Sequence, residues 1–360
     1  MSKKHSNISI FVPHIGCPNK CSFCNQRYIT GTSSAPNAAD VEKAVITAVK
    51  SKKYDPSTTE IAFFGGSFTA INRNYMLSLL EAASSFVRIG LVSGIRISTR
   101  PDAIDDEILM LLKEYNVTAI ELGAQSFNNH VLKMNNRGHT AKDTETAATL
   151  IKKYGFELGL QIMTGLYSDD NESLERTVRK IIDIKPDTVR IYPTIVLKDT
   201  DLAALYIDGV YKPQTLSEAV KICSKLYLML TKENIDVIRL GLHSIEQDAY
   251  LAGPWHPAFS ELCQSQIMLT KVLTHLFTKG EYTIYVGKSD VSKMTGQRKS
   301  LVRLICANEA RMKIGGMSYQ PMVIDADIDE DFDYEQALEA AVTAFVAKQF
   351  GKFIVETLEE

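Results

Sequence analysis

The sequence predicts an α/β protein built around a parallel sheet. Over the first 195 residues, short runs rich in β-branched and other apolar residues alternate with stretches whose apolar residues recur at helical spacing. This alternation is typical of repeated βα units, in which each helix returns the chain to the same edge of the sheet. Glycine and polar residues directly follow several of the apolar runs, where the carboxyl ends of parallel strands are expected to form a site.

The expected elements can be placed in chain order. Six predicted strands cover residues 8–12, 60–64, 94–98, 117–122, 156–163 and 188–192. Helical spacing is clear at 40–50 and 74–87, and another helix is expected to begin at Asp105. Asp105 suits the N-cap position because its carboxylate can accept hydrogen bonds from the first backbone amides. The apolar face of this helix is expected to consist of Ile108, Leu111, Leu112 and Tyr115.

After residue 195 the pattern continues and then changes character. Apolar spacing predicts a helix over 217–232, and a β-branched run predicts a strand over 235–240. From about residue 288 a basic stretch is followed by a strongly acidic one. We therefore expect residues 1–288 to form the main domain with its flanking elements, and residues 289–360 to form a small C-terminal α/β extension.

The composition is that of a folded globular protein. Of the 360 residues, 45% are hydrophobic and 23% are charged, which suffices for a large core. The net charge of −3 excludes an overall basic surface for nucleic acid. No apolar run is long enough to span a membrane and no export signal precedes the first strand, so we expect a cytoplasmic protein with no membrane partner. One local group of basic residues is present. The acidic balance of the chain favours an ordinary solvated helix face, and the alternative is a basic patch for RNA, for the residues Lys293, Arg298, Lys299 and Arg303.

Three cysteines with the spacing CxxxCxxC follow the first predicted strand. Cys17, Cys21 and Cys24 are expected to bind metal, because thiolates are soft ligands that select iron–sulfur clusters or zinc. Three ligands leave one metal position open, as a catalytic metal requires. A zinc site with His14 as the fourth ligand, or simple loop thiols, are the alternatives. The isolated cysteines, expected to be small core residues, are Cys223, Cys263 and Cys306.

The cysteine motif, with Phe23 before its last cysteine, resembles the cluster loop of the radical S-adenosylmethionine (radical SAM) superfamily. In that superfamily three cysteines hold a 4Fe-4S cluster, and S-adenosylmethionine binds its fourth iron and is cleaved to a 5′-deoxyadenosyl radical. The resemblance implies these two cofactors and an electron donor such as flavodoxin or ferredoxin. It also implies a partial (β/α)6 TIM-like barrel, the strand count of which agrees with the six predicted strands.

Further motifs at strand ends extend the resemblance. Gly65, Gly66 and Ser67 lie where the superfamily has its Gly-Gly motif, although such a turn is also common between a strand and a helix. The segments 121–127 and 136–140 resemble the Elongator catalytic subunit and anaerobic coproporphyrinogen oxidase. This likeness implies that Gln125 and Arg137 contact S-adenosylmethionine.

Two positions depart from these relatives. Gln161 lies where the oxidase has a cofactor-binding Asp, so it keeps the hydrogen-bonding ability and loses the charge. Ser98 lies where both relatives usually carry Glu. The resemblance therefore implies a cofactor role for Gln161 and leaves Ser98 without an assigned one.

Candidate catalytic residues are less well defined. Arg190 and Tyr192 follow the same resemblance and are expected near the barrel mouth, on the substrate side. Alternatively, Arg190 pairs with an acidic residue and Tyr192 belongs to the core. His256 stands in a proline-containing loop with the only Trp, and it could transfer protons or merely form a hydrogen bond.

The expected function is that of a radical SAM enzyme in the Elongator-like group, acting on RNA of the tRNA type. About 55 residues remain after the region of resemblance, too few for the acetyltransferase-like domain of the full Elongator subunit. The sequence therefore resembles short bacterial relatives without that domain. Two alternatives remain open: a radical SAM oxidoreductase acting on a small molecule, and a non-catalytic zinc or iron–sulfur module associated with RNA.

Overall fold

The computed structural model describes residues 5–13, 17, 21–25, 35–242, 247–273, 280–287, 319–326 and 353–357. The chain divides into two compact units. The first contains residues 1–213, 230–239 and 243–252. The second contains residues 214–229, 240–242 and 253–360. In the described part of the chain, no helix is long and apolar enough to cross a membrane.

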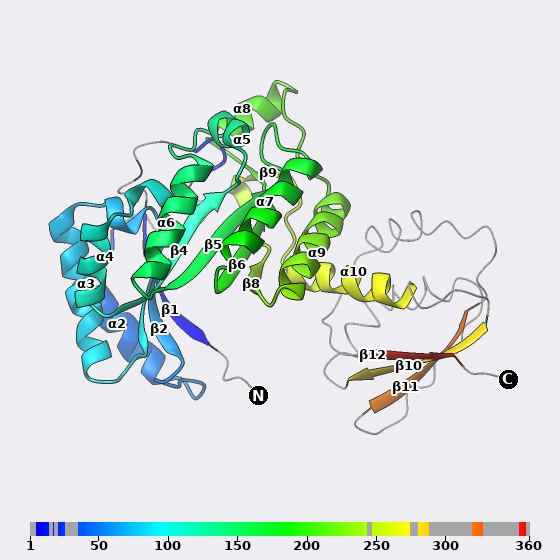
Figure 1. Cartoon of the computed structure of the whole chain (residues 1–360), viewed down its shortest axis with the longest axis horizontal. Helices are drawn as coiled ribbons and strands as arrows, with labels where there is room; N and C mark the ends of the chain where they lie inside the picture. Colours follow the sequence, from blue (N-terminus) through cyan, green and yellow to red (C-terminus); the bar gives the residue numbers. More distant parts are fainter. Residues whose placement is uncertain are drawn as a thin grey trace. The chain divides into compact units, whose positions relative to one another are not determined.

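A curled parallel sheet forms the centre of the first unit (Figure 1). Its strand order is β1-β2-β3-β4-β5-β6-β8. Consecutive strands from β1 to β6 pair in parallel, so the order in space is the order in the chain. The strands are β1 (Ser6–Val12), β2 (Thr59–Gly65), β3 (Gly94–Thr99), β4 (Val117–Gln125), β5 (Glu157–Thr164), β6 (Thr188–Pro193) and β8 (Asp236–Leu240).

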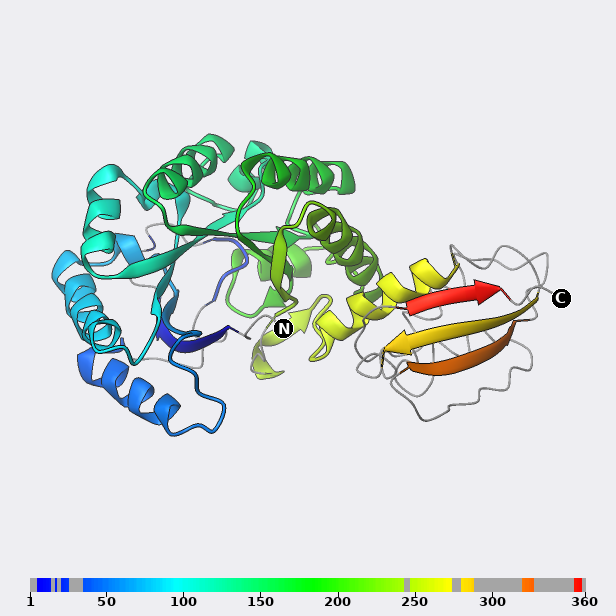
Figure 2. The same cartoon turned by 60° about the horizontal axis from the view of Figure 1, so that its bottom comes forward.

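Helices cover the outer, convex face of this sheet (Figure 2). Each begins at a side chain that accepts a hydrogen bond from the first turn, such as Asn37, Asp105 and Thr140. The covering helices are α2 (Ala38–Val49), α3 (Arg73–Arg88), α4 (Asp106–Glu114), α6 (Ala141–Lys153) and α7 (Asn171–Ile184). Shorter elements at the carboxyl ends of the strands are η1 (Phe68–Ala70), η2 (Pro101–Ala103), α5 (Asn129–Met134), α8 (Asp201–Ile207) and the paired β7 (Val196–Leu197) and β9 (Tyr250–Ala252).

The two faces of the sheet differ in polarity. The outward residues of the strands are apolar and fully buried under the helices, as Ile61, Phe63 and Ile97 illustrate. The inward positions, which alternate with them, include the buried charged residues Arg96 and Glu121. Charged groups are rarely buried unless they are paired, so the inside of the curled sheet contains a specific polar network.

The second unit contains a separate antiparallel sheet of order β11-β10-β12. Its strands are β10 (Gly280–Gly287), β11 (Tyr319–Ala326) and β12 (Phe353–Thr357). Most of α9 (Leu216–Lys232) and all of α10 (Phe259–Leu273) also belong to this unit, and η3 (Gln247–Ala249) belongs to the first. Cys223 and Cys263 are buried in the second unit, which confirms them as core residues. The division at residue 288 stays a prediction, and Cys306 and the basic residues 293–303 lie outside the described residues.

The α/β class and the parallel barrel-like sheet are confirmed, with two corrections of detail. The predicted strand over 235–240 joins the sheet as β8, so the sheet has seven strands instead of six. In α4 the buried face consists of Ile108, Leu109 and Leu112. Leu111 is only half-buried and Tyr115 ends the helix as its C-cap, because the face in contact with the sheet is rotated toward Leu109.

Candidate active site

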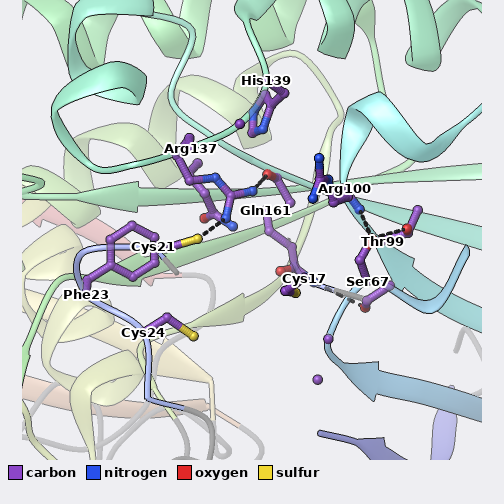
Figure 3. A pocket seen from close by; sticks show the side chains of 16 residues that line it. Cys17, Cys21, Phe23, Cys24, Ser67, Thr99, Arg100, Arg137, His139 and Gln161 are labelled. Atoms are coloured by element: carbon purple, nitrogen blue, oxygen red, sulfur yellow. Dashed lines mark hydrogen bonds between the residues drawn. The ribbon is translucent and has the colours of Figure 1, made fainter. Parts of the chain in front are cut away.

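A cavity of about 150 Å³ opens at the carboxyl ends of the strands. Its walls come from the cysteine loop, the ends of β2 to β5 and the segment between α5 and α6 (Figure 3). The predicted metal and cofactor residues that line it are Cys17, Cys21, Cys24, Gly65, Gly66, Ser67, Gln125, Arg137 and Gln161. The fold thus brings all of them to one place from five separate segments of the chain.

The cysteines lie on one side of this cavity. Cys17 is exposed, whereas Cys21 and Cys24 are partly buried. Burial, together with the charges of the other two cysteines, raises the pKa of Cys24 to about 12. The Arg137 side chain donates a hydrogen bond from Nη1 to Cys21 Sγ over 3.0 Å. The charge of Arg137 acts against the burial that raises the pKa values of Cys17 and Cys24, and metal must displace the thiol protons on binding.

Asn135, a fully buried residue, holds the cysteine loop in place. Its backbone oxygen accepts from Ser22 N at 3.1 Å, and its Oδ1 accepts from Ser22 Oγ at 3.0 Å. Its side-chain nitrogen donates to the carbonyls of Val131 and Tyr167. Phe23 packs against the apolar clusters beneath the loop. The loop is therefore fixed both by hydrogen bonds and by an aromatic anchor.

The glycine turn after β2 lies tightly against the end of β1. Gly65 has φ +112°, and a Cβ there would lie 2.6 Å from the Val12 carbonyl oxygen. Gly66 N donates to the same oxygen at 2.7 Å. Ser67 Oγ lies 2.9 Å from Thr99 Oγ1 and accepts from the Arg100 backbone amide at 3.2 Å. Glycine is required at position 65 for both the conformation and the space.

Gln125 is presented by a distortion at the end of β4. The register of β4 shifts between Leu122 and Gln125, and Gln125 has φ +63°, which is unusual for a residue other than glycine. Its Oε1 is buried without a hydrogen-bond partner, as is Arg137 Nε. Arg137 Nη2 donates to the Gly123 carbonyl over 2.6 Å. Strain and unpaired polar atoms at one site suggest that a ligand completes them.

Gln161 lies across the cavity, on β5. Its Nε2 donates to Glu121 Oε2 at 3.0 Å and to Ser98 Oγ at 3.4 Å. Ser98 itself is buried and lines the cavity. Ser98 is the position where both relatives usually carry Glu. In the sheet it lies opposite Glu121 of β4, which supplies a carboxylate beside it.

Arg190 binds both oxygens of Glu121, with Nε–Oε2 of 2.6 Å and Nη2–Oε1 of 2.8 Å. The ion-pair interpretation of Arg190 is therefore confirmed. Tyr192 is half-buried, packs against the Val131, Met163 and Leu166 cluster, and has a pKa raised by burial. His256 belongs to the second unit, where its Nδ1 accepts from Ala258 N at 3.0 Å. Catalytic roles for these three residues stay predictions.

Several residues of the cavity were not predicted from the sequence. His139 is buried, with Nε2 3.1 Å from the Ala124 carbonyl, and burial and the charge of Arg137 lower its pKa to about 4. Thr99 and Arg100 also line the cavity. The sequence contained signals that could have identified them. Thr99 and Arg100 directly follow the predicted strand 94–98, and His139 lies in the segment 136–140, which carries part of the family resemblance.

Sequence profiles identify the class. The Radical SAM superfamily profile matches residues 11–181, and the radical SAM C-terminal domain profile matches residues 186–268. Together they account for most of the chain, and they include the cysteine loop and every strand of the parallel sheet except most of β1. The chain therefore belongs to the radical SAM superfamily, whose members are enzymes.

Within the superfamily the chain is similar to Elongator-type proteins. It is 35% identical over 131 residues to the tRNA uridine(34) acetyltransferase of Methanocaldococcus jannaschii, a match that covers 36% of this chain and 24% of that protein. It is 27% identical over 208 residues to mouse Elongator complex protein 3, covering 51% of this chain and 38% of that protein. The chain thus matches about a quarter to two fifths of these relatives' length.

Among solved structures, the archaeal Elp3 of Methanocaldococcus infernus with its first 46 residues deleted has the same fold. The TM-score is 0.59 at 19% identity, and the match covers 89% of this chain and 74% of that one. The likeness supports the barrel architecture derived above from strand order and pairing.

The superfamily uses an iron–sulfur cluster and S-adenosylmethionine, and the cavity residues fit both. Among the described residues, no three His, Cys, Asp or Glu side chains come close enough to hold a single metal ion. A multi-iron cluster is different because its thiolates bind separate iron atoms. The unpartnered Gln125 Oε1 and Arg137 Nε supply an acceptor and a cationic donor for a zwitterionic ligand. His14, the fourth ligand of the zinc alternative, lies outside the described residues.

Proposed function

We propose that this chain is an Elongator-like radical SAM enzyme that cleaves S-adenosylmethionine reductively and modifies a tRNA-type RNA. The observation that carries the proposal is the convergence of the three cysteines, the glycine turn, Gln125, Arg137 and Gln161 on one cavity. When bound, the cluster supplies the electron that converts S-adenosylmethionine to methionine and a 5′-deoxyadenosyl radical. The protein supplies binding, orientation and exclusion of water.

Each group of residues has its own task in this proposal. Cys17, Cys21 and Cys24 hold the cluster, and Arg137 places a positive charge beside them. A guanidinium is also suited to a carboxylate, which S-adenosylmethionine carries. The glycine turn allows the backbone to approach a ligand closely, since it has no side chain there. Gln125 offers a buried acceptor whose hydrogen bond is unmade without a ligand.

The RNA substrate is supported by the relatives, whose names refer to uridine 34 of tRNA and to the Elongator complex. If RNA binds, its affinity must fall steeply with salt because bound counterions are released from the phosphates. We expect such a fall between 50 and 200 mM salt, measured with unmodified tRNA. An interaction insensitive to salt would contradict RNA recognition and favour a small-molecule substrate.

The first experiment is anaerobic reconstitution with iron and sulfide, followed by reduction and addition of S-adenosylmethionine. We expect 5′-deoxyadenosine in the wild type and none in Cys24→Ala. Cys223→Ala is the matched control, because Cys223 is a core thiol of the second unit. Iron content is measured on all three proteins. Zinc in place of iron, with no 5′-deoxyadenosine from the wild type, would overturn the proposal.

A further inference from the structure

The inside of the sheet contains a paired carboxylate directly behind the cavity. Glu121 is 1% exposed, and Arg190 grips both of its oxygens in the bidentate manner. A second guanidinium approaches from β3, with Arg96 Nη1 3.6 Å from Glu121 Oε1. Glu121 is thus the carboxylate of an ion pair with two guanidinium groups, and the oxygens of a carboxylate only accept hydrogen bonds.

The fold reserves space for this carboxylate. Glu121 lies opposite Gly159 in the pairing of β4 with β5. A Cβ on Gly159 would lie 2.8 Å from Glu121 Cγ, so any larger residue there would displace the side chain. The position of Glu121 is therefore set by packing as well as by its ion pair.

Gln161 approaches Glu121 with its amide group. An amide has one end that donates and one that accepts, and the two ends look alike in shape. Here the end within 3.0 Å of Glu121 Oε2 must be the NH₂ group, because an acceptor-only partner excludes the carbonyl oxygen. The same NH₂ group reaches Ser98 Oγ at 3.4 Å. Gln161 also lines the cavity (Figure 3). Because its NH₂ group is used by Glu121 and Ser98, its carbonyl oxygen is the end left for a ligand.

We propose that the Glu121–Arg190 pair is a positioning device that makes Gln161 present only a hydrogen-bond acceptor to the cofactor. The ligand group it selects is a hydroxyl or ammonium donor of S-adenosylmethionine. Without the pair the amide could rotate at little cost, and part of the population would turn a donor toward the cavity. This inference rests on the proposed cofactor.

The test is the affinity of the iron-loaded, unreduced protein for S-adenosylmethionine, measured by equilibrium dialysis so that turnover plays no part. We expect Glu121→Gln to weaken binding about tenfold, the loss of one well-made hydrogen bond. The control is Glu157→Gln, which removes a carboxylate that contacts Arg96 and has no bond to Gln161. Its affinity should stay within twofold of the wild type.

Combining two substitutions distinguishes a positioning role of Glu121 from a general loss of structure at the site. If Glu121 acts through Gln161, then Glu121→Gln causes no further loss of affinity once Gln161→Met is present. Equal losses in both backgrounds would overturn the proposal. If Glu121→Gln does not fold, Arg190→Lys is used in the same comparison, since Lys keeps the charge and loses the bidentate grip. Absence of binding by the iron-loaded wild type would instead contradict the proposed function itself.

Discussion

At the scale of the residue, Gln125 combines two unfavourable features. It has a left-handed backbone conformation that costs about 1–2 kcal/mol for a residue with a Cβ, and a buried acceptor without a partner. Both costs are explained if the residue is kept for a ligand. Under the proposed function, Gln125 is a residue at which stability is given up for the binding of a ligand.

A first prediction follows from this strain. Gln125→Gly should raise the free energy of unfolding by about 1 kcal/mol, because glycine adopts φ +63° freely and leaves no unpaired acceptor. The same variant should bind S-adenosylmethionine more weakly. Urea unfolding of the metal-free protein and equilibrium dialysis of the loaded protein measure the two effects. A loss of stability together with unchanged affinity would show that Gln125 is a structural residue.

Gly65 allows a second prediction. Gly65 and Gly90 both have positive φ, but only Gly65 has a backbone atom in the path of a Cβ. Gly90→Ala should therefore cost about 1–2 kcal/mol from backbone conformation alone. Gly65→Ala should cost several kcal/mol more, since the Val12 carbonyl cannot move without disturbing β1. Equal unfolding midpoints for the two variants in urea would contradict this reading of the turn.

At the scale of the element, the short helix α5 and the cysteine loop behave as one piece, joined by Asn135. Asn135→Ala removes the bond to Ser22 and also the bonds to the Val131 and Tyr167 carbonyls that hold Asn135 itself in place, whereas Ser22→Ala removes only the first of these. We expect iron release to a chelator to accelerate strongly in the first variant and moderately in the second. Asn129→Ala is the control, because Asn129 is an exposed residue of α5 that bonds Ala141 instead of the loop. Identical release rates in all of these proteins would contradict a link between the helix and the loop.

At the scale of the whole molecule, two buried groups predict sensitivity to acid. The folded pKa of His139, about 4, is below its ordinary value of 6.5, so His139 contributes stability above pH 6.5 that is lost as the pH falls toward 4. Burial opposes the charge of Glu60, but the bonds from His5 and Thr118 and the charge of Arg96 lower its pKa to about 2. Its contribution is lost between about pH 4.5 and 2.

The corresponding experiment follows the free energy of unfolding between pH 7 and pH 4. In His139→Gln the slope over this range should fall by up to about 1.4 kcal/mol per pH unit, because one titrating group is removed. His130→Gln, a change at an exposed position, serves as the control. The same slope in His139→Gln and the wild type would exclude His139 as the source of the acid sensitivity.

Asp169 acts in the opposite direction: burial raises its pKa to about 6, so its contribution to stability is lost as the pH rises from 3.8 to 6.

The elements and the main cavity residues were predictable because their signals are local or belong to a motif. A few consecutive residues are enough to recognise the apolar runs of the strands, an N-cap such as Asp105 or the spacing of the cysteines. The identity of the partners in the network behind the cavity was not predictable. Glu121, Arg190 and Gln161 come from three strands, and the bonds between them depend on strand register. Asn135 was missed for the same reason, since its partners lie 32 and 113 residues away.

The order of the strands in the sheet determines the order in which its parts can fold during synthesis. Because each strand from β2 to β6 pairs with the one made just before it, the sheet can grow one βα unit at a time during synthesis. Of the segments that line the cavity, the cysteine loop is made first, and Gln161 on β5 is made last. At ~5–20 residues per second this gap lasts on the order of ten seconds. During that interval the three cysteines lack the other residues of the cavity, so the complete site that would hold a cluster exists only after the fifth strand has docked.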